Sequence, residues 1–237
     1  LAHDTSGVLY IADTSNCRIR KVTPQGTIVA VAGTVAQDAY YRDGGPATEA
    51  RLYNPHAVAT DTSGVLYISH QRSPTWSGAV RKVTRDGIIT TMMQGSYPRG
   101  ICLDQSGSLY VALLTPNAVR KIAPDGAVTT VAGTGTAGFS GDGGPATAAR
   151  LSSPYAVVVD PAGSIYIADS DNHRIRKVTP DGTISTAAGT GVQGFGGDGG
   201  PATQAALSFP RALALDAANN LYIADTNNHR IRKVTPA

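Results

Sequence analysis

The sequence predicts an all-β fold, a β-propeller of four-stranded antiparallel blades in which five repeat units are visible. First, a motif of the form LYIAD recurs at intervals of 57, 43, 56 and 56 residues, with its tyrosines at Tyr10, Tyr67, Tyr110, Tyr166 and Tyr222. Second, 27 Gly and 14 Pro among 237 residues supply many turns. Third, Glu49 is the only Glu among 17 acidic residues, whereas helices favour Glu over Asp.

Each repeat contains four short segments with the character of strands. In the fourth repeat they are AVVVD, SIYIAD, RIRKVT and TISTAAGT, and each is rich in β-branched or aromatic side chains. Turn sequences such as DPAG and TPDG separate them, because Pro fixes φ and Gly accepts a positive φ. Residues 9–12 are apolar on both faces of their strand, so each sheet must be covered on both sides. Propeller blades packed against their neighbours meet that requirement.

We expect a single propeller domain over residues 1–237. Its blades span about 1–34, 55–95, 98–134, 154–190 and 210–237, and the last blade lacks its outer strand. The first repeat begins inside its innermost strand, because residues 1–4 align with residues 213–216. Four complete repeats and three further strands give 19 strands, which favours a fragment or the ordered part of a longer chain.

The repeats closely resemble the NHL-repeat family. The resemblance is carried by LYIADTSNCRIRKVTPQG at 9–26, IYIADSDNHRIRKVTPDG at 165–182 and LYIADTNNHRIRKVTP at 221–236. Two loops, FSGDGGPATAARLSSP at 139–154 and FGGDGGPATQAALSFP at 195–210, resemble the linker of bacterial secreted NHL proteins and of the NHL region in teneurin-type surface proteins. The chain is therefore identified as a member of this family by resemblance.

The resemblance implies a ring that most often has six blades and a secreted or cell-surface location. The N-terminal residues carry no signal region, and no apolar run approaches the roughly 18 residues of a membrane helix, so we expect no membrane insertion. Repeats two and three depart from the family pattern, because SHQ at 69–71 and LLT at 113–115 replace the Asp-containing turn. Family inferences about that turn do not extend to them.

Acidic residues recur at equivalent repeat positions, which favours a structural role. Fourteen of the 16 Asp lie at the end of the first or second strand, in the third turn, or in the GDGGPAT loops. Such repetition is typical of side chains that accept turn N–H groups or pair with a neighbouring Arg. No unique pair of carboxylates stands out for acid–base chemistry, so we predict no catalytic residue.

Basic residues follow the repeats in the same way. Thirteen of the 20 Lys and Arg lie in the third strands, distributed over the blades rather than gathered with aromatic residues on one face. With a net charge of only +3, this pattern argues against nucleic-acid binding. By resemblance, some animal NHL domains do bind RNA.

Neither a metal nor a cofactor is predicted. The strings DSDNH at 169–173 and DTNNH at 225–229 offer oxygen donors for calcium, but they lack the acidic density and glycine spacing of a calcium loop. A capped turn is therefore the favoured interpretation. His3, His56 and His70 share no motif with a Cys that would indicate zinc.

Four polar or aromatic residues at equivalent positions form the predicted ligand site. Each follows the Pro that precedes an innermost strand, and they are His56, Arg99, Tyr155 and Arg211. The innermost strands of a propeller line its channel, so we expect these side chains to ring the channel mouth and to bind a ligand. The alternative is that they are exposed residues at the start of a strand, selected for solubility.

An irregular insertion in the second repeat is the predicted partner contact. It covers residues 70–78 and contains His70, Arg72 and the only Trp, Trp76. A lone Trp on a long loop is typical of contact with a partner or ligand. Core packing is the alternative.

The GDGGPAT loops have a structural interpretation. Ala, Thr and Glu after Pro46 predict a helix of one to two turns, with Pro46 at its first position, that caps the blades. Backbone N–H groups of Gly-Asp-Gly-Gly would suit an anion, but the Lys-Ser/Thr of a nucleotide-binding loop is missing. A packing cap is the favoured interpretation.

These observations favour a non-catalytic binding or scaffold propeller that presents one loop-rich face and its channel mouth to a protein, glycan or small anionic ligand. The first alternative is a propeller enzyme of the lactonase or lyase type. By resemblance, such enzymes often hold a divalent metal through Glu, Asp, Asn or His, whereas the predicted ring has one His beside two Arg and one Tyr. The second alternative is a structural segment of a larger surface protein.

Overall fold

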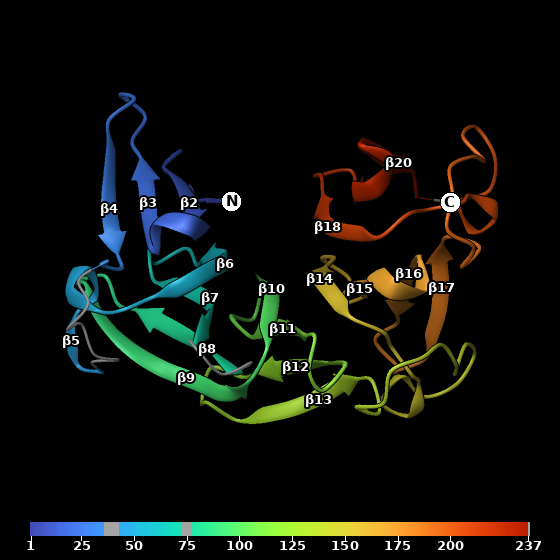
Figure 1. Cartoon of the computed structure of the whole chain (residues 1–237), viewed down its shortest axis with the longest axis horizontal. Helices are drawn as coiled ribbons and strands as arrows, with labels where there is room; N and C mark the ends of the chain where they lie inside the picture. Colours follow the sequence, from blue (N-terminus) through green and yellow to red (C-terminus); the bar gives the residue numbers. More distant parts are fainter. Residues whose placement is uncertain (36–42, 73–76, 237) are drawn as a thin grey trace. The chain divides into compact units, whose positions relative to one another are not determined.

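The computed structural model describes residues 1–35, 43–72 and 77–236, which form antiparallel β-sheets (Figure 1). The chain divides into two compact units, Leu1–Leu103 and Asp104–Ala237. In each sheet, strands that follow one another in the chain are neighbours, apart from one added strand. The five sheets are called blades one to five in chain order.

Unit one contains blade one, blade two and the first strand of blade three. Blade one has the order β1 (Ala2–His3), β2 (Leu9–Asp13), β3 (Arg18–Val22), β4 (Ile28–Ala32). Blade two has the order β6 (Tyr53–Thr60), β7 (Leu66–Arg72), β8 (Ser77–Val83), β9 (Ile88–Ser96), with the short strand β5 (Gly45–Pro46) outside β9. A single residue, Tyr97, joins β9 to β10 (Pro98–Leu103).

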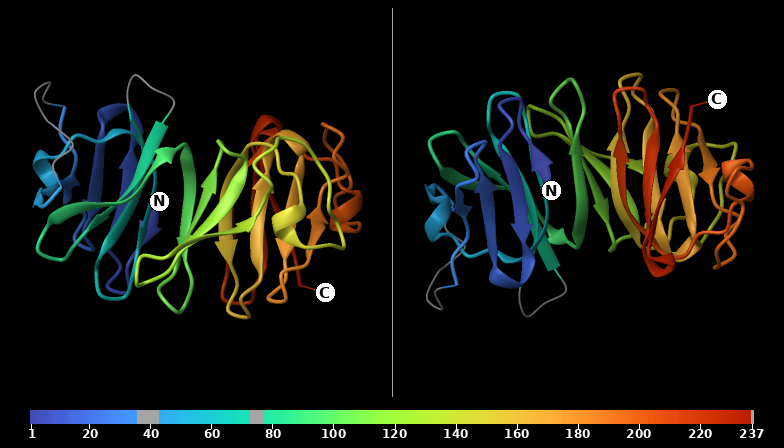
Figure 2. Two further views of the ribbon diagram at one scale, coloured as in Figure 1. Left: turned by 90° about the horizontal axis from the view of Figure 1, so that it is seen from below. Right: turned by 90° about the horizontal axis from the view of Figure 1, so that it is seen from above.

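Unit two contains the remaining strands, and Figure 2 shows those of blade four side by side. Blade three continues with β11 (Leu109–Leu113), β12 (Ala118–Ile122), β13 (Val128–Ala132). Blade four has the order β14 (Pro154–Val159), β15 (Ile165–Asp169), β16 (Arg174–Val178), β17 (Ile184–Ala188). In the described part of the chain, blade five has three strands, β18 (Pro210–Leu215), β19 (Leu221–Asp225), β20 (Arg230–Val234).

The structure confirms the predicted all-β chain of five blades, and the described residues contain no sixth sheet. The strands are apolar on both faces, as expected: every residue of β11 is buried, and Ile167 and Ile175 of blade four have no exposed surface. The described residues hold one strand more than the 19 predicted. That strand, β5, arises because the first GDGGPAT loop pairs with Ile88 and Ile89 of β9.

Each GDGGPAT loop ends in a single turn of 3-10 helix, the lower end of the predicted one to two turns. The three turns are η2 (Ala47–Glu49), η3 (Ala146–Ala148), η5 (Ala202–Gln204). Pro46 lies outside its turn, because its ψ of 130° is extended. The second turn does not continue, because Ala149 is extended and the Ala146 carbonyl accepts the Gly133 N–H at 2.9 Å. The turn still packs as a cap, with Leu151 fully buried behind it.

The first turn of a blade is organised by its Asp. In blade two, Asp61 Oδ1 accepts the N–H groups of Ser63 and Val65 at 2.9 and 3.0 Å. Its Oδ2 accepts the Tyr67 hydroxyl at 3.2 Å. Burial alone would raise the pKa of Asp61, but these hydrogen bonds favour the carboxylate and hold its pKa below the ordinary value. Asp216 makes the equivalent contacts in blade five, which bears out the structural role predicted for these carboxylates.

Replacing Asp61 by Ala should lower the free energy of unfolding by about 1–3 kcal/mol, because the Val65 N–H loses its acceptor in a half-buried turn. The wild-type advantage is expected in full above the ordinary aspartate pKa of 3.8 and should disappear as the pH falls through the lowered pKa. Urea unfolding at a series of pH values measures both. In the control Asp125→Ala, which removes one acceptor of the Ala127 N–H in an exposed turn, the loss should be clearly smaller. Equal losses would contradict the assignment.

Candidate functional site

The four residues predicted to form a channel mouth fall into two pairs, one in each unit. In unit one, His56 of β6 lies against Arg99 of β10, and Arg99 Nη1 is 2.8 Å from His56 Nδ1 and 3.0 Å from Nε2. In unit two, the Arg211 guanidinium of β18 lies over the Tyr155 ring of β14, with Cζ 5.1 Å from the ring centroid. That all four share one site stays a prediction.

Further polar side chains surround the pair in unit one. Arg99 Nη2 donates to the Tyr97 hydroxyl at 3.1 Å, and Arg99 Cζ lies 4.8 Å from the Tyr97 ring centroid. Gln71 of β7 donates to the same hydroxyl, and Asn54 Nδ2 donates to Gln71 Oε1 at 2.9 Å. Together Asn54, His56, Gln71, Tyr97 and Arg99 are called the His56–Arg99 cluster.

The sequence prediction does not include Asn54, Gln71 or Tyr97. Asn54 and Tyr97 immediately precede the Pro at or near the start of an innermost strand, so a search on both sides of that Pro would have found them. Gln71 lies in the insertion, next to a residue that was selected. Its contact with Tyr97 crosses from one blade to the next, and repeat spacing gives no signal for such a contact.

Two hydrogen bonds set where the innermost strands of unit one begin. Thr14 Oγ1 donates to the Pro55 carbonyl at 2.8 Å, and Ser69 Oγ donates to the Arg99 carbonyl. In both cases the donor belongs to the preceding blade. His56 and Arg99 therefore meet because polar side chains of blades one and two hold the starts of β6 and β10.

Near neutral pH the only charged side chain of the His56–Arg99 cluster is the Arg99 guanidinium. Burial, and then the positive charge of Arg99, lower the pKa of His56 from 6.5 to about 4. The imidazole is therefore neutral near pH 7 and offers a lone pair to the guanidinium. The planar guanidinium of Arg99, together with N–H and O–H groups around it, is suited to the oxygens of an anion such as a carboxylate.

The insertion predicted as a partner contact is mostly strand, because β7 extends to Arg72 and β8 begins at Ser77. His70 is 0% exposed, and its Nδ1 accepts the Tyr53 N–H at 3.4 Å. This burial argues against direct contact between His70 and a partner. The side chain of Arg72 and the whole of Trp76 lie outside the described residues, so their part of the contact stays a prediction.

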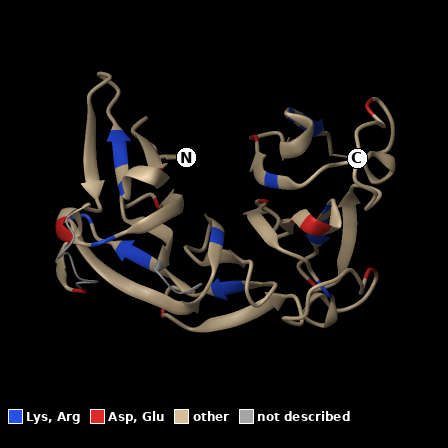
Figure 3. Cartoon of the chain, in the orientation of Figure 1, with Lys and Arg blue, Asp and Glu red and all other residues tan. Residues whose placement is uncertain are grey.

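In blade four the position of His70 is taken by Asp169, which belongs to a buried ion-pair network. Asp169 Oδ2 is 3.3 Å from Arg176 Nη1, and both side chains are fully buried. Arg176 Nη2 also contacts Asp142 of the GDGGPAT loop at 2.5 Å. Burial raises the pKa of Asp169 to about 6, although the Ser152 N–H and the Arg176 charge act in the opposite direction. Figure 3 shows the basic residues on such third strands and the acidic residues in loops.

The DSDNH string folds as a turn of 3-10 helix, η4 (Ser170–Asn172), in which Asp169 makes no side-chain capping bond, so the predicted capped turn forms without its cap. Asn172 Nδ2 donates to Asp169 Oδ2 at 2.8 Å and to the Gly138 carbonyl at 2.7 Å, so it satisfies acceptors that a cation would otherwise need. The same contacts recur in blade five around Asn228. Within the described residues, no group of three or more His, Cys, Asp or Glu is placed to hold a metal ion.

His173, which ends this turn, connects blade four to blade five. Its Nδ1 accepts the Phe209 N–H at 3.2 Å, and the two rings meet edge to face with centroids 4.6 Å apart. Phe209 has a φ of 48°, a left-handed conformation that costs about 1–2 kcal/mol outside Gly. Asn117 makes the equivalent contact between blades three and four, where its Oδ1 accepts the Ser153 N–H at 2.9 Å.

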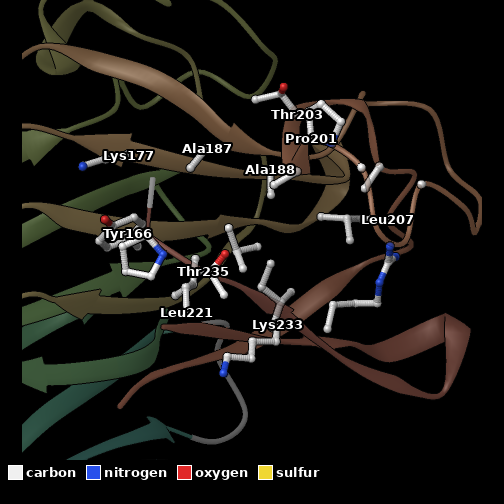
Figure 4. Close-up of a pocket in the computed structure, with 18 of the residues that line it drawn as sticks. Tyr166, Lys177, Ala187, Ala188, Pro201, Thr203, Leu207, Leu221, Lys233 and Thr235 are labelled. Atoms are coloured by element: carbon white, nitrogen blue, oxygen red, sulfur yellow. The ribbon is translucent and has the colours of Figure 1, made fainter. Parts of the chain in front are cut away.

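A cavity of about 860 Å³ lies in unit two between blade four, blade five and the third GDGGPAT loop (Figure 4). Its walls include Tyr166 and Lys177 of blade four, Leu221 and Lys233 of blade five, and Pro201 of the loop. It borders β20, an edge strand in the described part of the chain. In blade four the corresponding edge of β16 is occupied by β17. The cavity therefore lies beside β20 at the position that β17 takes beside β16 in blade four, and we do not assign it to the predicted ligand site.

No helix in the described residues is long and apolar enough to cross a membrane.

Comparison with known proteins confirms the resemblance to NHL-repeat proteins. The family model "Teneurin NHL domain" matches residues 135–193, and the model "NHL repeat" matches residues 207–234. Teneurin-4 of Mus musculus is 31% identical over 282 residues, which cover 96% of this chain and 10% of that protein. The chain thus spans about a tenth of the length of the curated relatives it matches.

Solved structures share the fold. An auxiliary nutrient binding protein from Bacteroides ovatus matches with a TM-score of 0.71 and 20% identity, over 99% of this chain and 58% of that one. Virginiamycin B lyase from Staphylococcus aureus matches with a TM-score of 0.60 and 17% identity, over 99% of this chain and 68% of that one. At these identities the likeness concerns the fold alone.

An NMR titration of the His56 ring tests the electrostatics of the cluster. We expect a midpoint near pH 4. Between about pH 6.5 and pH 4, His56 is protonated in the unfolded chain but neutral in the folded protein. Its contribution to the free energy of unfolding should therefore fall as the pH drops through this range. Arg99→Ala should raise the midpoint, since it removes a charge and leaves the burial, whereas Arg85→Ala in an exposed turn should not. A wild-type midpoint near 6.5 would contradict the assignment.

Proposed function

The chain belongs to the NHL-repeat propeller family, and on that basis we propose that it is a non-catalytic binding module whose His56–Arg99 cluster holds a small anionic ligand. The observation that carries the proposal is the half-buried Arg99 guanidinium, which lies beside an imidazole with a pKa of about 4. A carboxylate oxygen at this place gains a charge-assisted hydrogen bond from Arg99. The neighbouring His56 ring is neutral near pH 7, so it does not neutralise the Arg99 charge. Tyr97 and Gln71 hold the guanidinium in position.

Unit two holds a pair that matches the one in unit one. Arg211 stacks on Tyr155 much as Arg99 stacks on Tyr97, so each unit holds an arginine against an aromatic ring near the start of an innermost strand. We assign His56 and Arg99 to the anion in unit one, and Tyr155 and Arg211 to ligand contact within unit two. The insertion with Arg72 and Trp76 is assigned to a protein or glycan partner, because a Trp supplies a large contact area at an interface.

The relatives are compatible with this role. The solved structure with the TM-score of 0.71 carries the description "auxiliary nutrient binding protein", and its likeness supports the choice of a binding propeller at the level of the fold. The similarity to teneurins, which are cell-surface proteins, supports a secreted or cell-surface location. It also supports the second alternative, a structural segment of a larger surface protein.

The enzyme alternative is supported by the fold only. Virginiamycin B lyase shares the blade architecture at 17% identity, a level at which catalytic residues do not transfer. Function in shared folds depends on the site rather than on the architecture. The His56–Arg99 cluster offers a cation and a neutral imidazole, a combination that suits anion recognition, so binding remains the main proposal.

Isothermal titration with citrate, succinate and inorganic phosphate tests the proposed site. We expect saturable binding of at least one of these anions, and a loss of about 10- to 150-fold in affinity for Arg99→Ala, the equivalent of about 1.5–3 kcal/mol for a charged hydrogen bond. Binding of inorganic phosphate, which keeps a negative charge at this pH, should strengthen as the pH falls through about 4, because His56 then becomes a second cation.

The matched control is Arg85→Ala, which removes the same charge from an exposed turn and should leave affinity unchanged. Thermal melting of each variant separates binding from folding. Unchanged affinity in Arg99→Ala, or a large fall in its Tm, would count against the proposed role and assign Arg99 to the structure instead.

A further inference from the structure

The outer edge of blade four is closed by a Gly-Asp-Gly-Gly segment. Asp142 Oδ1 is 2.5 Å from Arg176 Nη2, and Asp142 Oδ2 accepts the Thr186 hydroxyl at 2.6 Å. The next two residues, 143 and 144, exchange hydrogen bonds of 2.8 and 2.9 Å with the carbonyl and N–H of Ile184. The receptor for this segment therefore consists of an arginine, a hydroxyl and one residue of strand edge.

Blade two uses the same receptor for the first GDGGPAT loop. Asp43 Oδ1 is 2.7 Å from Arg81 Nη2 and accepts the Thr91 hydroxyl at 3.0 Å. The Gly44 N–H donates to the Ile89 carbonyl at 2.8 Å. Two copies with equivalent contacts show which sequence the receptor accepts, namely Asp-Gly-Gly-Pro.

Blade three has this receptor without a linker, because only Tyr97 joins β9 to β10. Arg120 of β12 stands opposite Thr130 of β13, in the register that pairs Arg176 with Thr186 in blade four. None of the carboxylates in the described part of the chain forms an ion pair with Arg120. Blade three therefore has the arginine and the hydroxyl of the receptor, but the connection before it has no Asp-Gly-Gly-Pro segment like those that bind in blades two and four.

The strand edge of blade three is correspondingly exposed. Val128 takes the position of Ile89 and Ile184, and it is 43% exposed, whereas those two residues are 0% exposed. In Figure 1, β13 forms the outer edge of its sheet. A bare edge with unpaired N–H and carbonyl groups is a template for another strand.

Blade one shows that exposure alone does not make the receptor. Its outer strand is also exposed, with Ile28 at 42%. Its arginine, Arg20, pairs with Asp13 of the same blade at 3.7 Å, as Arg176 pairs with Asp169 in blade four. The difference is the hydroxyl, because Ala30 stands where blades two, three and four have a Thr. Within the described residues, only blade three combines an exposed edge with both the arginine and the hydroxyl.

We propose that the outer edge of blade three binds a separate polypeptide through an exposed Asp-Gly-Gly-Pro segment. The Asp carboxylate binds Arg120 and Thr130, and the glycine backbone adds to the sheet at Val128. In the two bound copies the pairing continues past the Pro, because the N–H groups of Ala47 and Ala146 donate to the Gly87 and Gly182 carbonyls at 2.7 and 2.8 Å. This surface lies on strands that the His56–Arg99 cluster does not use, so it is independent of the proposed anion site.

The backbone of the bound copies explains why glycine must follow the Asp. Gly44 and Gly143 have φ values of +80° and +83°, a left-handed conformation that glycine adopts at little cost. The corresponding glycine of the third loop, Gly199, has a φ of +82°. A partner with a bulky residue in this place would bind under strain, which restricts the edge to Asp-Gly sequences.

An NMR titration of the ¹⁵N-labelled chain with the peptide FSGDGGPAT, the sequence of residues 139–147, tests the proposal. We expect saturable shifts at the amides of Val128 and Thr130 and at the Arg120 side chain. A peptide with Asn in place of Asp should bind at least about tenfold more weakly, because the charge-assisted contact is lost. This arm leaves the protein itself unchanged, so its result does not depend on the folding of a variant.

Two protein variants provide a matched pair. Val128→Pro removes the outward N–H and should abolish the shifts, since Pro is tolerated on an edge strand but cannot donate. Val128→Ala keeps the N–H and should bind within about threefold of the wild type.

Three results would overturn the proposal. The first is the absence of saturable shifts, and the second is shifts at Ile89 and Ile184 alone, which would mean competition with the chain's own loops. The third is self-association abolished by Val128→Pro without peptide binding, which would assign the edge to a second copy of the chain.

Discussion

A guanidinium buried between two carboxylates is the interaction on which blades four and five depend. Arg176 has no exposed surface and lies between Asp169 of its own blade and Asp142 of the loop before it. Loss of Arg176 would leave the fully buried Asp169 carboxylate without its cation, which is far more costly than loss of a surface pair. The same loop pairs through Pro145 with Thr183, the residue before β17. One electrostatic requirement therefore fixes the inner turn, the third strand and the outer edge together.

The sequence predicted these blades well because their determinants are local and repeated. Two-sided apolar strands, Asp-Gly turns and the recurring Asp at each first turn depend on neighbours a few residues away, and the turn around Asp61 formed as expected. The helix after Pro46 has one turn, within the predicted range, and Pro46 lies outside it rather than at its first position. Its length depends on tertiary contacts, because the neighbouring strand occupies the carbonyls that a second turn would use. His70 was expected in a loop, but it continues β7 and is buried, since tertiary pairing overrode the irregular local sequence.

The candidate site was predicted in part for the same reason. Position after a strand Pro selected His56 and Arg99, which do meet, because both residues begin innermost strands of neighbouring blades. The contacts of Tyr97 with Gln71 and Arg99 depend on side chains that converge across blades. A repeat pattern places backbones and leaves such convergence unspecified. The protonation state of His56 could not be predicted from the sequence either, because burial rather than sequence position sets its pKa.

The ring nitrogen of His173 that accepts the Phe209 N–H has a consequence for how unit two unfolds. Blade five obtains an acceptor for a strained left-handed residue from blade four, and blade four obtains the equivalent acceptor from Asn117 of blade three. Each blade is thus less stable without its predecessor, which is the condition for nearest-neighbour cooperativity in a repeat array. Unfolding that starts at one blade therefore weakens the next, and the unit melts as a chain of coupled steps rather than as independent sheets.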